Sequence, residues 1–118
     1  MTTAQQPLSG KVAVITGAGR GIGRAIALAY AGAGAAVVCA ARTTAQLEEI
    51  VHAIRTSGGQ ALAVPTDVTQ PAAVEQLFAQ SAAHFGGIDI VVINAGINPD
   101  RHTVEVSDPA AWRLKHAR

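Results

Sequence analysis

A glycine-rich stretch near the amino terminus constrains the fold of this 118-residue chain more than any other feature. Residues 16–23 read Thr-Gly-Ala-Gly-Arg-Gly-Ile-Gly; they follow the apolar run 12–15 and precede a helix-forming segment rich in alanine. A buried strand, a glycine turn and a helix N-terminus form a cradle in which free backbone N–H groups and the helix dipole attract an anion. Glycine is required because a side chain would hold a phosphate group away from that backbone. The sequence therefore predicts a phosphate-binding turn.

Strand and helix patterns alternate along the chain after this turn. Continuous apolar runs indicate strands that are covered on both faces, as in a parallel sheet, and apolar residues three and four positions apart indicate helices. Units of this length join parallel strands by right-handed crossovers. We therefore expect an α/β fold, a doubly wound parallel sheet with strand order 3-2-1-4. The expected strands are 11–16, 35–41, 61–64 and 88–93, and the expected helices are 21–33, 44–57 and a third that starts after Thr69.

Threonines and glycines mark the expected helix ends. Thr43 or Thr44 precedes the second helix and Thr69 precedes the third, where a hydroxyl can accept a hydrogen bond from a free backbone N–H group. Gly34 follows the first helix, Gly58 and Gly59 follow the second, and two glycines at 86–87 follow the third. Glycine is typical of these positions because it tolerates a left-handed backbone.

The spacing of the glycines separates two kinds of dinucleotide-binding turn. The general fingerprint G-x-G-x-x-G fails, because its third glycine falls on Ile22 when it begins at Gly17 and on Arg24 when it begins at Gly19. The pattern T-G-x-x-x-G-x-G fits from Thr16 and resembles that of the short-chain dehydrogenase/reductase family. This resemblance implies a Rossmann-type sheet that binds a nicotinamide dinucleotide; a glycine turn without a ligand is the alternative.

Composition and charge argue against several other functions. The net charge is +1 and aromatic residues make up 3% of the chain, so no nucleic-acid surface is expected. Cys39 is the single cysteine and lies in an apolar run, which predicts a buried, inert thiol. Residues 1–10 lack the regions of a signal peptide, and the uncharged run 25–41 is too short and glycine-interrupted to span a membrane. We therefore expect a cytoplasmic protein with a core built from its 49% hydrophobic residues.

The end of the second strand distinguishes the two nicotinamide cofactors. An acidic residue there hydrogen-bonds the ribose hydroxyls of NAD, but here Ala41 ends the strand and Arg42 follows it. A guanidinium at this point can pair with the 2′-phosphate of NADP, and Arg20 in the glycine turn can supply a second cation. The resemblance links basic residues at these two positions to NADP(H). We expect NADP(H), with NAD(H) as the alternative if Arg42 is only a solvated loop residue.

A second stretch that matches the family follows the third strand. Asp67 and Val68 stand there, and the resemblance implies that the carboxylate accepts from the adenine amine while the next backbone N–H serves the ring. The alternative is that Asp67 is a turn or cap residue before Thr69.

A third match follows the fourth strand. Asn94, Ala95 and Gly96 resemble the family's N-N-A-G, with Ile93 in place of the first asparagine, and Asp89 before the strand also fits. The resemblance implies that the small residues let the backbone approach the adenine ribose and that Asn94 braces the strand end. Together, the residues expected to bind the cofactor are Thr16, Gly17, Arg20, Gly21, Ile22, Gly23, Arg42, Asp67, Val68, Asn94, Ala95 and Gly96.

The catalytic residues that the resemblance implies do not occur in these 118 residues. Family members reduce carbonyls or oxidise alcohols with a Tyr-x-x-x-Lys pair, in which the lysine lowers the pKa of the tyrosine acid/base, and with a serine that holds the substrate oxygen. The single tyrosine is Tyr30, with Gly34 four residues later, and the lysines are Lys11 and Lys115. The histidines show no metal-ligand spacing. We therefore predict no catalytic and no metal-binding residue.

We expect three segments: a flexible tail at 1–9, a dinucleotide-binding half-domain at 10–98, and a polar tail at 99–118 with the truncated start of a further helix near Asp108. The chain would then be a fragment, the N-terminal half of a longer fold, as a frameshift or an internal stop would produce. Its fourth strand would form an open apolar edge that invites aggregation or pairing with a partner chain. Full-length relatives are expected to form homo-oligomers.

The resemblance implies hydride transfer between the nicotinamide and a carbonyl or alcohol carbon, in an NADP(H)-dependent oxidoreductase of the 3-oxoacyl-carrier-protein reductase kind. The 118-residue chain alone is expected to be inactive, because it lacks Tyr-x-x-x-Lys. Two alternatives stay open. One is a non-catalytic module that senses NADP(H), and the other is a half-chain whose catalytic half comes from a separate partner.

Overall fold

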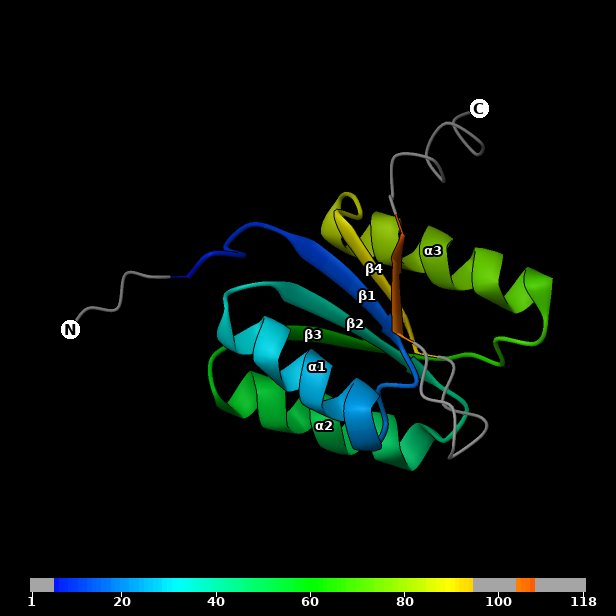
Figure 1. Ribbon diagram of the computed structural model, residues 1–118, viewed down its shortest axis with the longest axis horizontal. Coiled ribbons are helices and arrows are strands. Elements are labelled where there is room, and N and C mark those ends of the chain that lie inside the picture. The colour runs from blue at the N-terminus through cyan, green and yellow to red at the C-terminus, as the bar shows by residue number, and fades with distance from the viewer. Residues whose placement is uncertain (1–5, 95–103, 108–118) are drawn as a thin grey trace.

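The structure, a computed structural model, describes residues 6–94 and 104–107 (Figure 1). Its strands form one sheet in the order β3-β2-β1-β4-β5. The first four strands are parallel and have the predicted order 3-2-1-4, which confirms the predicted α/β, Rossmann-like fold. The strands are β1 (Val12–Thr16), β2 (Ala36–Ala41), β3 (Gln60–Pro65), β4 (Ile90–Asn94) and β5 (Val104–Ser107), and the helices are α1 (Gly21–Gly32), α2 (Thr44–Thr56) and α3 (Pro71–Phe85).

The helices lie on both faces of the sheet. α1 and α2 cover one face and α3 covers the other (Figure 1). Successive side chains of a strand point to opposite faces, so Ile15 of β1 shares a core cluster with Leu47 of α2, whereas the adjacent Val14 shares one with Leu77 of α3. This double cover explains why β1 is buried at every position. In the part of the chain that the structure describes, no helix has the length and apolar character needed to cross a membrane.

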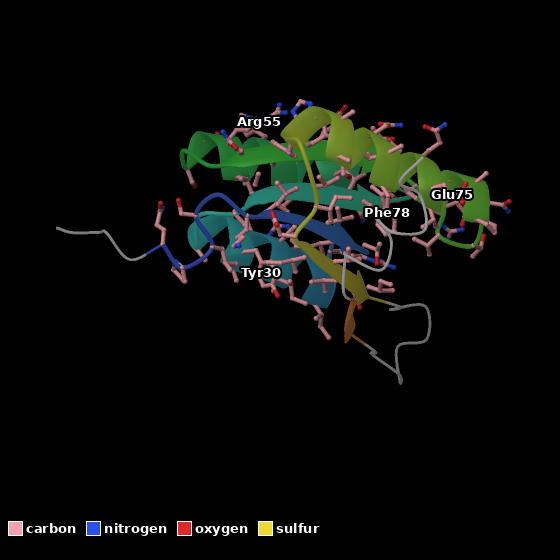
Figure 2. All side chains as sticks on the ribbon, turned by 90° about the horizontal axis from the view of Figure 1, so that it is seen from above. Tyr30, Arg55, Glu75 and Phe78 are labelled. Atoms are coloured by element: carbon pink, nitrogen blue, oxygen red, sulfur yellow. The ribbon has the colours of Figure 1, made fainter. Side chains whose placement is uncertain are left out.

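The packing of α3 shows how one helix covers its face of the sheet. Leu77 and Ser81 are its buried residues, and Phe78 packs against the same cluster while Glu75 is exposed (Figure 2). The Ser81 hydroxyl donates to the Leu77 carbonyl at 2.7 Å. This bond satisfies a polar group that would otherwise be costly to bury among apolar side chains.

The register of the parallel strands brings their carboxyl ends to one edge of the sheet, which we call the carboxyl edge. Thr16 of β1 pairs with Ala40 of β2, and Ala41 pairs with Pro65 of β3. Asn94, the last residue of β4, donates its backbone N–H to the Thr16 hydroxyl at 2.9 Å. The turns that lead into α1, α2 and α3 all leave from this edge. In sheets of this kind, ligands bind at this edge.

Glycines end the helices as predicted. Gly34, Gly58 and Gly86 follow α1, α2 and α3 with φ of +101°, +92° and +86°. These values lie in the left-handed region, which glycine reaches without strain from a Cβ.

Of the two predicted N-cap sites, the structure confirms the one before α2 and not the one before α3. Thr43 is the N-cap residue of α2, although its side chain makes no capping hydrogen bond. The prediction that Thr69 caps α3 is wrong, because Gln70 is the N-cap residue there. The physical reason lies in the preceding turn, where the Thr69 hydroxyl donates to the Asp67 carboxylate at 2.6 Å. That bond holds Thr69 outside the helix.

β5 overturns the prediction of an open apolar edge. It runs antiparallel to β4, with Val106 opposite Val92 and Val104 opposite Asn94. The backbone of β4 therefore has a strand on each side, and Ser107, expected near a helix start, ends the strand instead. The sequence Val-Glu-Val-Ser alternates apolar and polar residues, a strand signal hidden in a segment interpreted as a polar tail. The predicted helix start near Asp108 lies outside the described residues.

The described part of the predicted N-terminal tail contacts the domain. Leu8 donates its backbone N–H to the Ala33 carbonyl at 2.9 Å, and Lys11 donates to the Leu8 carbonyl at 2.9 Å. The Leu8 side chain packs against the cluster under α1 and α2. The domain boundaries themselves stay predictions.

Candidate cofactor site

The turn between β1 and α1 has a backbone shape that requires its glycines. Gly17 and Gly21 have φ of +64° and +62°, in the region that L side chains rarely adopt. A Cβ at Gly23 would collide with the Gly17 carbonyl. The three glycines of the predicted motif thus bring the turn close over the start of α1.

The first turn of α1 offers backbone donors and positive charge. Its N-cap residue, Arg20, makes no side-chain capping bond, and no acidic residue stands in the first turn. The first N–H groups of a helix lack intrahelical partners, and the helix dipole adds partial positive charge. The Arg20 side chain is exposed beside them. This arrangement favours an anionic group such as a phosphate.

Asn94 closes the site from the end of β4. Its side-chain nitrogen lies 3.0 Å from the position of a Cβ at Gly17 and 2.8 Å from that of a Cβ at Gly23. A side chain at either glycine would therefore displace the Asn94 amide. The Asn94 Oδ1 atom is buried and has no hydrogen-bond partner among the described residues, although buried acceptors nearly always have one.

The glycine turn is held against the end of β2. Ala18, which is fully buried, donates its backbone N–H to the Ala40 carbonyl at 3.1 Å. Arg42 follows two residues later and is exposed. Because Ala40 also pairs with Thr16, the glycine turn and the cation of Arg42 lie at neighbouring points of the carboxyl edge.

Asp67 lies in a tight turn after β3. Its Oδ1 atom accepts hydrogen bonds from the Thr69 hydroxyl at 2.6 Å and from the Thr69 backbone N–H at 3.0 Å. These bonds, with a smaller contribution from the positive charge of Arg42, hold the pKa of the Asp67 carboxyl below its usual value. Asp67 thus makes the contacts of a turn residue, as the alternative interpretation of the sequence expected. Its carboxylate stays ionised near neutral pH.

Two apolar side chains are exposed at the same edge. Ile22 at the start of α1 is 41% exposed and Val68 after β3 is 44% exposed. Large apolar side chains on a surface are informative when they flank polar groups that could hold a ligand.

The comparison with protein families agrees with this geometry. The family model described as "short chain dehydrogenase" matches residues 11–115, which include β1 to β5 and every predicted cofactor residue. The chain belongs to the short-chain dehydrogenase family.

Individual relatives support the assignment of the chain to this family. The short chain dehydrogenase/reductase AacuN of Aspergillus aculeatus is 41% identical over 92% of the chain and 42% of its own length. Versicolorin reductase 1 of Aspergillus parasiticus is 46% identical over 85% of the chain and 38% of its own length. A crystal structure of a short-chain type dehydrogenase/reductase from Mycobacterium marinum is 50% identical, with a TM-score of 0.75 over 79% of the chain and 38% of that protein. The chain thus spans about two fifths of the length of these relatives.

Family members bind a nicotinamide dinucleotide, and the described residues at the carboxyl edge of this chain fit such a group. A Cβ at Gly17 or Gly23 would occupy the space between the glycine turn and Asn94. The free donors of α1 match the charge of a pyrophosphate, and Asn94 has an acceptor without a partner in the described residues. Ala95 and Gly96, the other two residues predicted after β4, lie outside the described residues.

Tyr30 does not belong to the candidate cofactor site. It stands near the C-terminal end of α1 and packs against the core cluster under α1 and α2 (Figure 2). Its backbone carbonyl accepts from Ala35, just before β2 begins. Tyr30 therefore lies toward the amino ends of the strands, away from the glycine turn.

One residue near the site was missed by the sequence analysis. Gln46, on the first turn of α2, fills the space beside Gly19. The fourth glycine of the turn, outside the T-G-x-x-x-G-x-G pattern, was the available signal. That the neighbour is Gln46 follows only from the packing of α2.

Proposed function

We propose that this chain binds NADP(H) in preference to NAD(H), as the cofactor-binding part of an oxidoreductase that interconverts a carbonyl and an alcohol. The observation that supports NADP(H) is the end of β2, where exposed Arg42 follows Ala41. No acidic residue stands in the first turn of α2 either. A carboxylate at this point would repel a 2′-phosphate, whereas a guanidinium attracts it.

Each predicted residue has a proposed role toward the cofactor. Gly17, Gly21 and Gly23 let the backbone approach the pyrophosphate, and the N–H groups at the start of α1 bind its oxygens. Arg20 and Arg42 neutralise the 2′-phosphate. When bound, the nicotinamide supplies or accepts a hydride; the residues of this chain bind and orient it.

The remaining roles concern the adenosine. The Oδ2 atom of Asp67 accepts a hydrogen bond from the adenine amine, since Oδ1 already accepts from Thr69. The Val68 backbone N–H donates a hydrogen bond to the adenine ring. Ile22 covers an apolar part of the cofactor. Thr16 and Asn94 brace the strand ends, with Ala95 and Gly96 beside the ribose.

The proposed reaction direction is reduction of a carbonyl. Versicolorin reductase 1 and a hydroxynaphthalene reductase-like protein of Metarhizium majus are relatives whose names describe reductases. These names support a carbonyl substrate in a general sense. The 3-oxoacyl group on a carrier protein stays a prediction, as do self-association and a cytoplasmic location.

The experiment compares dissociation constants of NADPH and NADH for the 118-residue chain by isothermal titration calorimetry at fixed ionic strength. We expect NADPH to bind more tightly and Arg42→Ala to weaken NADPH about tenfold, with little change for NADH, since one charge-assisted contact is worth about 1.5–3 kcal/mol. Lys11→Ala removes one exposed cation before β1, at the opposite edge, and is the matched control. Equal affinities for the two cofactors would contradict the NADP(H) proposal.

A non-catalytic NADP(H)-binding module is the second candidate. The absence of Tyr-x-x-x-Lys from the 118 residues favours it for this chain taken alone. The complementation hypothesis is less favoured, because β5 already pairs with the edge of β4 where a partner strand was expected to add.

A further inference from the structure

Gly19 is a glycine whose conformation does not require glycine. Its φ is not positive, unlike those of Gly17 and Gly21 on either side. A Cβ at position 19 would lie 2.8 Å from Oε1 of Gln46 and 3.0 Å from its Cβ. The side chain of Gln46, contributed by α2, therefore takes the place that a side chain at position 19 would occupy.

The position of Gln46 places a neutral amide between two proposed phosphate-binding elements. Gln46 is in the first turn of α2, four residues after Arg42, and it touches the glycine turn at Gly19. Its side chain is half-buried and makes no hydrogen bond to any other described residue. The amide atoms of Gln46 are not among the buried polar atoms without a partner, so they stay accessible to a ligand that binds beside Gly19.

Arg42 and the N-terminus of α2 contribute positive charge close to Gln46 in the sequence. Thr43 makes no capping bond and no acidic residue stands in the first turn of α2, so the backbone N–H groups there stay available. Arg42 stands directly before the helix. Gln46 contacts Gly19 and stands one helical turn after Arg42, so an anion held by Arg42 and the glycine turn would bind in its neighbourhood.

We infer that Gln46 is a specificity-determining residue that donates its side-chain N–H to the 2′-phosphate of NADP(H). The inference rests on the proposed NADP(H) function and extends it from Arg20 and Arg42 to a residue on α2. An amide offers two N–H donors without a charge. It can bind the phosphate oxygens while the guanidinium of Arg42 supplies the countercharge.

The test is a charge change that keeps the size of the side chain. Gln46→Glu places a carboxylate where the 2′-phosphate binds. We expect the dissociation constant of NADPH to rise about tenfold or more, since two like charges a few ångströms apart repel by about 1–4 kcal/mol near a protein surface. NADH lacks this phosphate, so its dissociation constant is expected to change by less than about twofold. Gln46→Ala is expected to weaken NADPH by a smaller factor, again without affecting NADH.

Two controls separate recognition from folding. Glutamate in the first turn of a helix is favourable with the helix dipole, so Gln46→Glu is expected to keep the melting temperature and the circular dichroism spectrum of the wild-type chain. Gln76→Glu makes the same change at an exposed site of α3, on the other face of the sheet, and is expected to leave both dissociation constants unchanged.

The outcomes are distinguishable. If the wild-type chain prefers NADPH but both Gln46 variants keep the wild-type ratio of the two dissociation constants, the inference is wrong and Gln46 only packs against Gly19. An equal rise in the dissociation constants of NADPH and NADH in these variants would also overturn the inference. A wild-type chain that binds NADPH no more tightly than NADH would instead overturn the NADP(H) proposal, and the inference with it.

Discussion

Gly23 shows how a single hydrogen atom sets the shape of the glycine turn. Its α carbon faces the Gly17 carbonyl so closely that a Cβ there would collide with it, and the same Cβ would lie 2.8 Å from the Asn94 side chain. Neither neighbour can move freely, because the Gly17 carbonyl is part of the backbone of the turn and the Asn94 side chain belongs to the last residue of β4. The requirement for glycine at this position is therefore steric and independent of any ligand.

Gly23→Ala is predicted to lower both stability and cofactor affinity. The added methyl group must push the turn away from α1, and forced overpacking of this kind costs about 1–3 kcal/mol. We expect a lower melting temperature and an NADPH dissociation constant raised about tenfold or more, measured by thermal denaturation and calorimetry.

Gly32→Ala is the matched control for this prediction. Gly32 is the last residue of α1, and a Cβ there would meet no atom within 4 Å. Alanine forms helix better than glycine by about 1 kcal/mol, so this variant is expected to be at least as stable as the wild type. Wild-type stability in the Gly23→Ala variant would show that the turn can relax.

The Cys39 thiol is predicted not to react with thiol reagents in the folded chain. Its side chain is fully buried in β2, and burial raises the pKa of the thiol from 9.0 to about 12. The thiolate is the reactive form, so a thiol reagent at pH 8 should modify the urea-unfolded chain and leave the native chain unmodified. Rapid modification of the native chain would contradict the burial of β2.

The same thiol makes stability depend on pH in one direction. Between about pH 9 and 12 the unfolded chain releases this proton and the folded chain keeps it. The unfolded state then binds fewer protons, so the free energy of unfolding falls as the pH rises through this range. Cys39→Ser is not a clean control, because it buries a hydroxyl; Cys39→Ala removes the titration.

At the scale of elements, two side-chain hydrogen bonds supplement the backbone pairing of β1 and β4. Thr16 is 5% exposed and accepts the backbone N–H of Asn94 at 2.9 Å. At the opposite ends of the same two strands, Asp89 accepts the Val12 N–H at 2.9 Å through its side chain. The two side chains thus tie both ends of a strand pair whose members are more than 70 residues apart in sequence.

Thr16→Val is predicted to destabilise the chain. Valine has the same shape but cannot accept, so it leaves the Asn94 N–H without its partner at a cost of about 1–3 kcal/mol. We expect a lower free energy of unfolding in urea, and wild-type behaviour for Thr16→Ser, which keeps the hydroxyl. Thr44→Val at the exposed start of α2 serves as the control for the change in side-chain type. Equal stability of Thr16→Val and wild type would mean that the Asn94 N–H finds another acceptor.

The elements that the sequence predicted well are those with strong local signals. β1 and β2 are continuous apolar runs, and glycines with positive φ end the helices near the expected residues. The errors occurred where a residue had two competing partners or a strand was short. Thr69 binds Asp67 rather than the start of α3, and the four residues of β5 form a strand only because β4 is available beside them.

At the scale of the whole molecule, the candidate site is assembled from four strand ends. The alternation of strands and helices was sufficient to predict that these ends meet, because parallel crossovers bring them to one edge. The contact of Gln46 with Gly19 could not be predicted in this way. It depends on the distance and rotation of α2 against the glycine turn, which no local pattern specifies.

The whole chain is predicted to bind NADPH without oxidising it. The prediction rests on the sequence, since the 118 residues contain no Tyr-x-x-x-Lys, the acid/base pair that the family resemblance implies. We expect no loss of NADPH absorbance with a panel of ketones and aldehydes, whereas enzymes of ordinary efficiency turn over about 1–1,000 times per second. The Gly23→Ala variant, purified in parallel, reveals contamination by a host reductase. Turnover that requires Gly23 would contradict the prediction.

The polarity of the strands has a consequence for protein engineering. The turns at Gly34, Gly58 and Gly86 all lie at the amino ends of the strands, opposite the glycine turn, Arg42 and Asp67. At Gly58 and Gly86 an added Cβ would meet no atom within 4 Å. A tag, a fluorophore or a fused domain inserted at 58 or 86 would therefore lie at the end opposite the candidate cofactor site. The candidate cofactor site and the positions suited to insertion thus lie at opposite ends of the sheet.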